Sequence, residues 1–102
     1  MGNRYYLSGP MSGLPGCNYE AFAEAALALR LSGCENIVSP HEIRPLVAAP
    51  TWEDHMRADL SALLECDTIV LLPGWQSSRG ARLELTVATA LGFAVACYQG
   101  SL

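Results

Sequence analysis

The chain contains no lysine. All six basic residues are arginines, ten residues are acidic, and the formal net charge is −4. This balance argues against nucleic acid or an anionic membrane surface as the main partner. No apolar run approaches the roughly 20 residues of a membrane-spanning helix, and the start of the chain lacks the apolar centre of a secretory signal. We therefore expect a cytoplasmic protein that binds neither membranes nor nucleic-acid polymers.

Paired cysteines and phosphate-binding motifs are also missing. The four cysteines occur singly, without a C-x-x-C pair, so no metal site is expected; they are Cys17, Cys34, Cys66 and Cys97. Scattered thiols fit a reducing compartment, where a buried cysteine serves as a small apolar side chain. A P-loop requires a lysine, and G-x-G-x-x-G is absent. The sequence therefore excludes both of these nucleotide fingerprints.

What the chain does contain indicates one globular domain over residues 1–102, because 51% of the residues are apolar and 16% are charged. Strands are predicted at Tyr5–Ser8, Ile37–Val38, Thr68–Pro73 and Phe93–Tyr98. Helices are predicted at Tyr19–Leu31, at Trp52–Glu65 and from about Ser78 to Gly92. This alternation predicts an α/β fold with a four-stranded parallel sheet, helices on both faces and a buried last strand.

Several residues indicate where the helices begin and end. Asn18 is expected to cap the first helix, and Gly33 suits the position after its last turn. Thr51 and Asp54 have the spacing of a capping box for the second helix. The prolines of residues 41–51 predict a loop before it. In parallel sheets, ligands bind at the carboxyl ends of the strands, here the loops after Ser8, Val38 and Leu72.

Two carboxylates interrupt the apolar stripes of predicted helices. The apolar neighbours are Met56, Leu60 and Leu63 for Asp59, and Val87, Ala88 and Leu91 for Glu84. An unpartnered buried carboxylate costs several kcal/mol, so chains usually avoid it. Each acid could accept hydrogen bonds from a loop or pair with an arginine: Arg57, Arg79 or Arg82. Alternatively, the two together could form the acid pair of glycosyl chemistry, in which one attacks the anomeric carbon and the other handles the leaving group's proton.

The segment before Glu84 offers a second candidate feature. Ser77, Ser78 and Gly80 lie at a predicted helix N-terminus, where free N–H groups favour an anion. The alternative is an ordinary serine N-cap. His41, at the ligand edge, could contact a base or sugar, or could be a solvated loop residue.

Other ring side chains have similar alternatives. Trp52 and Trp75 are candidate platforms for stacking a base, or core residues. His55, in the first turn of the second helix, is expected at the surface.

Three segments give the chain a resemblance to a known family. "YLSGPMSG", "DLSALLECDTIVLLP" and "SRGARLELTVATALG" occur in this order and cover most of the sequence. Together they resemble the nucleoside 2-deoxyribosyltransferase-like family, whose closest characterised branch is the 2′-deoxynucleoside 5′-phosphate N-hydrolases. The resemblance implies a flavodoxin-like fold and cleavage or transfer at the N-glycosidic bond of a 2′-deoxynucleoside or its 5′-monophosphate.

The resemblance also implies roles for individual residues. Glu84 matches the nucleophile that forms a glutamyl-deoxyribosyl intermediate, Asp59 the acid that assists departure of the base, and Tyr6 the tyrosine that orients the nucleophile. Gly9 and Ser78 match positions lining the sugar and the 5′-phosphate. From the same loops, Ser8, Ser77, Gly80 and His41 are the further substrate-binding candidates. No metal or organic cofactor is implied.

The chain departs from the family at two places. Pro10 and Ser12 stand where the hydrolase branch has a hydroxyl and an arginine for the phosphate, so Arg79 or Arg82 would have to supply the positive charge. Family members usually continue beyond the fourth strand, and any such contribution to the site would have to come from elsewhere or be missing. Members of the family are commonly dimers, so the resemblance implies a homodimer or higher homo-oligomer.

Two other functions remain open at this stage. One is a non-catalytic nucleotide-binding module that uses the same pocket for sensing. The other is an interaction domain on the same scaffold, without a nucleotide ligand.

Overall fold

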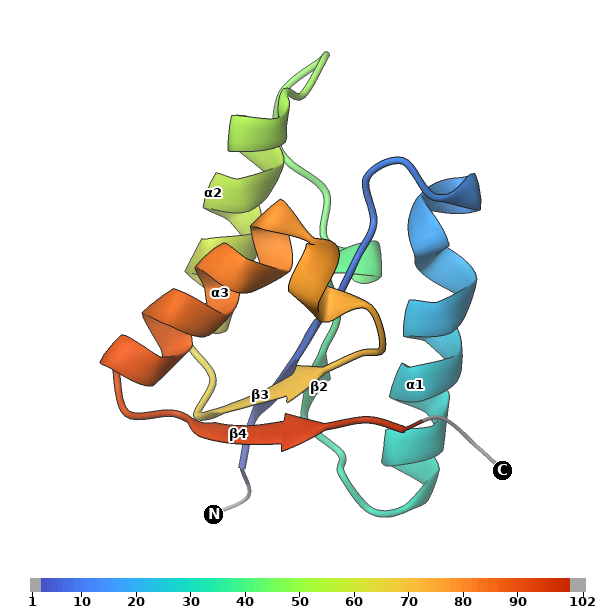
Figure 1. Cartoon of the computed structure of the whole chain (residues 1–102), viewed down its shortest axis with the longest axis vertical. Helices are drawn as coiled ribbons and strands as arrows, with labels where there is room; N and C mark the ends of the chain where they lie inside the picture. Colours follow the sequence, from blue (N-terminus) through green and yellow to red (C-terminus); the bar gives the residue numbers. More distant parts are fainter. Residues whose placement is uncertain (1–2, 100–102) are drawn as a thin grey trace.

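A four-stranded parallel sheet forms the centre of the computed structural model, which describes residues 3–99 (Figure 1). The strand order is β2-β1-β3-β4, and the strands are β1 (Tyr5–Ser8), β2 (Ile37–Val38), β3 (Thr68–Leu71) and β4 (Ala94–Cys97). All three pairings are parallel. The strand order reverses between β1 and β3, which is the switch point where this fold class binds ligands.

Three helices cover the sheet. In Figure 1, α1 (Tyr19–Leu31) lies alone on one face, while α2 (Trp52–Leu63) and α3 (Arg79–Ala90) lie together on the other. Short 3₁₀ turns occupy Pro15–Asn18, Pro40–Glu42 and Trp75–Ser77. The chain is therefore a small flavodoxin-like three-layer sandwich, as the sequence predicts.

The alternation of side chains along the central strands separates two apolar cores. Leu7 and Val70 pack with Phe22 on the α1 face. Tyr6 and Ile69 belong to the core beneath α2 and α3. Successive strand residues point to opposite faces, so Ser8 lies on the same side as Tyr6. This register brings two hydroxyl-bearing side chains of β1 to the face that holds α2 and α3.

Most helix boundaries follow the sequence signals. The capping box of Thr51 and Asp54 is confirmed, and Gly33 adopts a φ of 107° after α1. The prediction for Asn18 is wrong, because its side chain makes no cap and instead donates to the carbonyl of Pro10. The second helix is two residues shorter than predicted, and β3 ends at Leu71, before the predicted Pro73.

The prediction of a buried last strand is also wrong. All four residues of β4 are exposed, and Val95 retains 47% of its accessible surface. The strand pairs with β3 on one side only, so it forms the edge of the described sheet. An apolar run cannot distinguish a central strand from an edge strand, since the side chains alone do not give the strand order.

Gly9 allows a close approach between the end of β1 and the end of β3. A Cβ at this position would lie 2.8 Å from the Cβ of Leu72. We predict that Gly9→Ala destabilises the fold by roughly 1–3 kcal/mol, because overpacking shifts backbone. Urea denaturation would measure it. Gly80→Ala is the control: its Cβ would meet only the flexible end of Met56, at 3.2 Å. Equal stability of the Gly9 variant and wild type would contradict the close approach of Gly9 to Leu72.

Candidate active site

Both acids line one cavity at the carboxyl edge of the sheet. It has a volume of about 300 Å³, within the range of small-ligand sites. Asp59 and Glu84 retain 9% and 4% of their accessible surface. The other walls of the cavity come from the loop after β1, the first turns of α2 and α3, and Pro40 after β2. The two carboxylates that break the helix patterns therefore face one ligand-sized space.

The Glu84 carboxylate is held by two hydroxyl groups from β1. The Tyr6 hydroxyl donates to Oε2 at 2.7 Å, and the Ser8 hydroxyl donates to Oε1 at 2.6 Å. Tyr6 and Ser8 are both fully buried. Because they are two residues apart on a strand, both point toward α3. Each oxygen of Glu84 thus has its own donor, which fixes the plane of the carboxylate.

Asp59 has a different environment. Among residues 3–99, no hydrogen bond or salt bridge to its carboxylate is present, although the side chain is almost completely buried. The nearby arginines have other partners: Arg57 pairs with Asp54, and Arg82 donates to the carbonyl of Ser78. Asp59 therefore faces the cavity as a buried acid without a counter-ion.

Burial changes the acidity of both groups. Burial raises the pKa of Asp59 to about 7. Burial also raises the pKa of Glu84 to about 7; the hydrogen bonds from Ser8 and Tyr6 lower it, and the nearby charge of Asp59 raises it. The pKa of Tyr6 rises well above its usual value through burial and both carboxylates, which keeps its hydroxyl protonated. The two donors favour the charged form at Glu84, whereas no such donor reaches Asp59 within residues 3–99.

The N-terminus of α3 lies between this cavity and a second, larger one. The Ser78 side chain accepts a hydrogen bond from the N–H of Ala81, so the predicted N-cap is present. Ser78 and Gly80 line both cavities, whereas Ser77 lines only the second, of about 810 Å³. Residues of the loop after β3 also line the second cavity. Both cavities are lined by the loop after β1 and by the N-terminus of α3.

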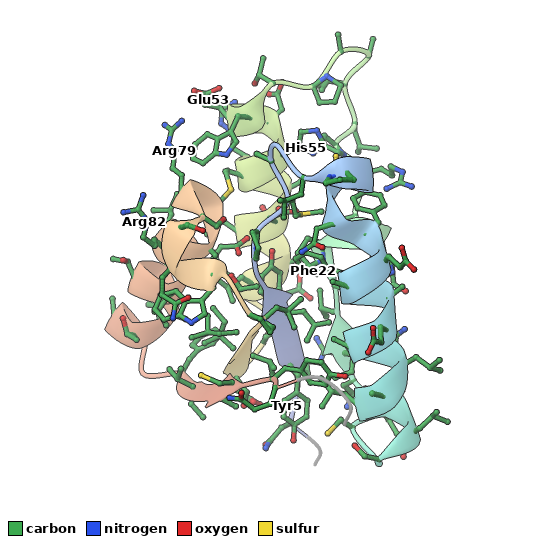
Figure 2. The ribbon with its side chains drawn as sticks, turned by 45° about the vertical axis from the view of Figure 1, so that its right-hand side comes forward. Tyr5, Phe22, Glu53, His55, Arg79 and Arg82 are labelled. Carbon is green, nitrogen blue, oxygen red and sulfur yellow. The ribbon has the colours of Figure 1, made fainter. Side chains whose placement is uncertain are left out.

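A tryptophan and an arginine contact each other beside the cavities, and the arginine, Arg79, lines only the larger one. The guanidinium of Arg79 lies 3.7 Å from the ring centre of Trp52, a cation–π contact. Figure 2 shows Arg79 beside the first turn of α2 and Arg82 projecting outward from α3. Trp52 lines both cavities. Trp75 packs against the core on the α2 and α3 face and lines neither.

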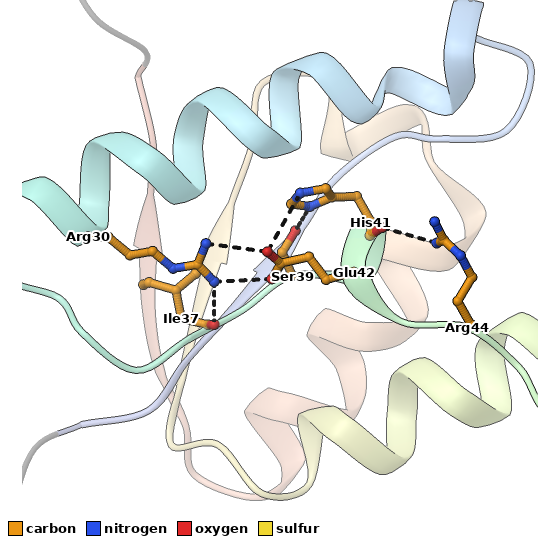
Figure 3. Close-up of polar contacts among 6 residues, drawn as sticks. All are labelled: Arg30, Ile37, Ser39, His41, Glu42 and Arg44. Carbon is orange, nitrogen blue, oxygen red and sulfur yellow. Dashed lines mark hydrogen bonds and ion pairs between the residues drawn. The ribbon is translucent and has the colours of Figure 1, made fainter.

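His41 lies outside both cavities. Its Nδ1 shares a hydrogen bond with the hydroxyl of Ser39, and its ring contacts those of Tyr19 and Phe22. Figure 3 shows the neighbouring contacts, in which Arg30 of α1 binds Glu42. This cluster ties the turn after β2 to α1. His41 thus contacts Tyr19, and Tyr19 lines the cavity that holds Asp59 and Glu84, here called the acid cavity.

A comparison with protein families matches residues 3–97 to the model described as "Domain of unknown function (DUF4406)". The chain belongs to this family. No curated protein matches it. Within residues 3–99 of this DUF4406 chain, no helix is long and apolar enough to cross a membrane.

The DUF4406 chain brings further residues to the acid cavity that the sequence patterns did not single out. Cys17 and Tyr19, near the start of α1, line it. His55, predicted at the surface, is exposed but also lines the cavity, one helical turn before Asp59. The four-residue spacing of His55 and Asp59 on one helix face is the signal that could have found it.

The two raised pKa values predict that stability depends on pH. Free carboxyl groups titrate near about 4, whereas Asp59 and Glu84 titrate at about 7 in the fold. The folded state then binds more protons, so the stabilisation is complete below about pH 4 and is lost as the pH rises to about 7. In Asp59→Asn this loss should be smaller than in wild type by up to roughly 4 kcal/mol, because each pKa unit corresponds to about 1.4 kcal/mol.

Urea denaturation of both proteins between these pH values would measure the difference. Glu53→Gln, an exposed acid on the same helix, is the matched control. A pH profile of Asp59→Asn that parallels wild type would show that Asp59 titrates normally.

Proposed function

We propose that the protein cleaves, or transfers a group at, the N-glycosidic bond of a 2′-deoxynucleoside or its 5′-monophosphate. The single observation that carries this proposal is the unequal acid pair. Glu84 has two hydroxyl donors, Asp59 has none among the described residues, and both face one cavity. An ionised nucleophile beside a protonated acid is what a double displacement at an anomeric carbon requires. The resemblance to the nucleoside 2-deoxyribosyltransferase-like family adds independent support.

In the first step, a carboxylate oxygen of Glu84 attacks C1′ of the sugar. The bond from C1′ to the base nitrogen breaks, its electron pair goes to the base, and protonated Asp59 donates its proton there. The product is a deoxyribosyl ester of Glu84. A substrate without a 2′-hydroxyl reaches the oxocarbenium-like state more easily, so little other machinery is needed.

In the second step, Asp59 acts as a base. It accepts a proton from a water molecule whose oxygen attacks C1′, and the ester bond to Glu84 breaks. A hydrolase releases 2-deoxyribose or its 5-phosphate, and a transferase uses a second base in place of water. Both acids then return to their initial states, so no redox partner or cofactor is required.

A 5′-phosphate would find positive potential at the start of α3. The helix dipole favours an anion there, and Arg79 is held beside it by its stacking on Trp52. Arg79 thus takes the place of the basic residue that the loop with Pro10 and Ser12 lacks. Arg82 lines neither cavity and donates a hydrogen bond to the carbonyl of Ser78.

A panel of deoxynucleosides and their 5′-monophosphates tests the proposal. Each compound is incubated with the protein, and free base is followed by chromatography. We expect release from at least one substrate and none with the matching ribonucleoside. A panel without any free base would contradict the enzymatic function.

A non-catalytic nucleotide-binding module is the second candidate, because the cavity and helix terminus would serve binding equally well. Glu84→Ala distinguishes the two: an enzyme loses turnover, whereas a sensor still binds. Binding is measured as a rise in melting temperature with added nucleotide. If no nucleotide raises it, a plain interaction domain is favoured.

Two further features belong to this proposal. We expect a homodimer, and the exposed, uncharged edge of β4 is one surface that could pair. Sedimentation velocity would report the mass in solution.

We also propose that the protein is cytoplasmic, since all four cysteines are free thiols.

A further inference from the structure

Ser8 was predicted to bind substrate, but its surroundings indicate another role. The side chain is fully buried and lines neither cavity, so a ligand does not reach it. Its hydroxyl lies 2.6 Å from Oε1 of Glu84. We infer that Ser8 is a positioning residue, which acts through Glu84 by holding its carboxylate and favouring the charged form. This inference deepens the proposed function, because it gives the reason why Glu84 attacks and Asp59 carries the proton.

The chemistry of the contact supports one direction of donation. An ionised carboxylate only accepts hydrogen bonds, and a serine hydroxyl has one proton to donate. In the described chain, the Ser8 hydroxyl makes no other side-chain hydrogen bond, so its proton is committed to Glu84. Ionised Glu84 satisfies the donors of Ser8 and Tyr6 together. Protonated Glu84 would have to donate to one of them and displace that donor.

The other groups around Glu84 act with or against this contact. From β1, Tyr6 donates to the second oxygen, and from α2, Asp59 opposes ionisation by its charge. His55 lines the same cavity on the solvent side. On α3 itself, Arg82 is exposed and bonded to a backbone carbonyl. Burial raises the pKa of Glu84, and the Ser8 hydrogen bond is the foremost contribution that lowers it.

Ser8→Ala isolates this hydrogen bond, because it removes one oxygen atom and adds nothing. The chain offers a matched control in Ser39, a serine that is also buried and whose hydroxyl bonds to His41 instead. Ser39→Ala therefore makes the same chemical change at the same depth without touching Glu84. Ser8→Cys keeps a weaker donor at the original position.

The test is a direct titration of the Glu84 carboxyl carbon by ¹³C NMR, with Glu84→Gln used to assign its resonance. We expect the midpoint in Ser8→Ala to move upward by on the order of one pH unit. Ser8→Cys should lie between this variant and wild type, and Ser39→Ala should match wild type. Equal midpoints in Ser8→Ala and Ser39→Ala would overturn the inference.

The titration does not depend on turnover, so it separates this inference from the proposed function. If no substrate is cleaved but the midpoint moves, the role of Ser8 holds and the enzymatic function fails. With an active substrate, the acidic limb of kcat/KM in Ser8→Ala should shift by the same amount. A uniform loss at every pH would indicate a structural role and contradict positioning.

Discussion

Replacing Glu84 with glutamine should lower the release of free base by roughly 10³-fold or more, because the proposed nucleophile is removed while the shape of the side chain is kept. The amide oxygen can still accept one of the hydrogen bonds from Tyr6 and Ser8. Substrate should therefore still bind. Free base is measured by chromatography, and binding by the shift in melting temperature.

The control for this variant is Glu53→Gln, which changes an exposed carboxylate on α2. We expect it to retain wild-type turnover. A Glu84→Gln protein that releases base at a rate near wild type would rule out covalent catalysis by this residue. A variant that neither binds nor folds is recognised by its melting temperature and is replaced by Glu84→Asp, which shortens the carboxylate's reach.

Replacing Asp59 with asparagine should lower the rate by roughly 10²–10⁴-fold, the usual contribution of general acid–base catalysis. The loss should depend on the leaving group, because a base that departs without protonation needs the acid less. Rates for a series of nucleosides with bases of different acidity would measure this. The alkaline limb of the pH–rate profile should also disappear, since it reports the deprotonation of Asp59.

An equal loss for every leaving group would contradict the role of Asp59 as the proton donor. It would indicate that Asp59 binds or orients the sugar instead. Glu53→Gln again serves as the control on the same helix.

The sequence predicts much of the fold because its strongest signals are local. The capping box of Thr51 and Asp54 and the turn at Gly33 depend only on near neighbours, and both are confirmed. The exposed face of β4 could not be predicted, because burial at a sheet edge depends on strand order. Asn18 makes no cap because its side chain reaches Pro10, a contact outside its helix.

The candidate site was predictable in part for the same reason. Asp59 and Glu84 stand out because each breaks the apolar pattern of its own helix. Such a break is visible within a single segment of the sequence. The contact between Ser8 and Glu84 joins residues 76 positions apart, and only the packing of α3 on β1 creates it. The resemblance implied Glu84 as the partner of Tyr6, but no sequence signal indicated that Ser8 also bonds to Glu84.

Unequal hydrogen bonding assigns different roles to two acids of similar pKa. In the fold, the pKa of each is about 7, and at Glu84 the hydrogen bonds from Ser8 and Tyr6 already lower the pKa against burial. The two acids differ in their hydrogen bonding, because both hydroxyl donors lie at Glu84. In the proposed mechanism, Glu84 is therefore the carboxylate that attacks, and Asp59 is the acid that donates a proton.

Trapping the sugar on Glu84 tests this division of roles most directly. Asp59→Asn is incubated with a deoxynucleoside whose base departs without protonation, so that the first step proceeds and the second lacks its base. After an acid quench and digestion, mass spectrometry should find the peptide containing Glu84 heavier by one deoxyribosyl group, and Glu84→Gln should show no such adduct. A substrate consumed without an adduct, or an adduct on any other residue, would contradict Glu84 as the nucleophile.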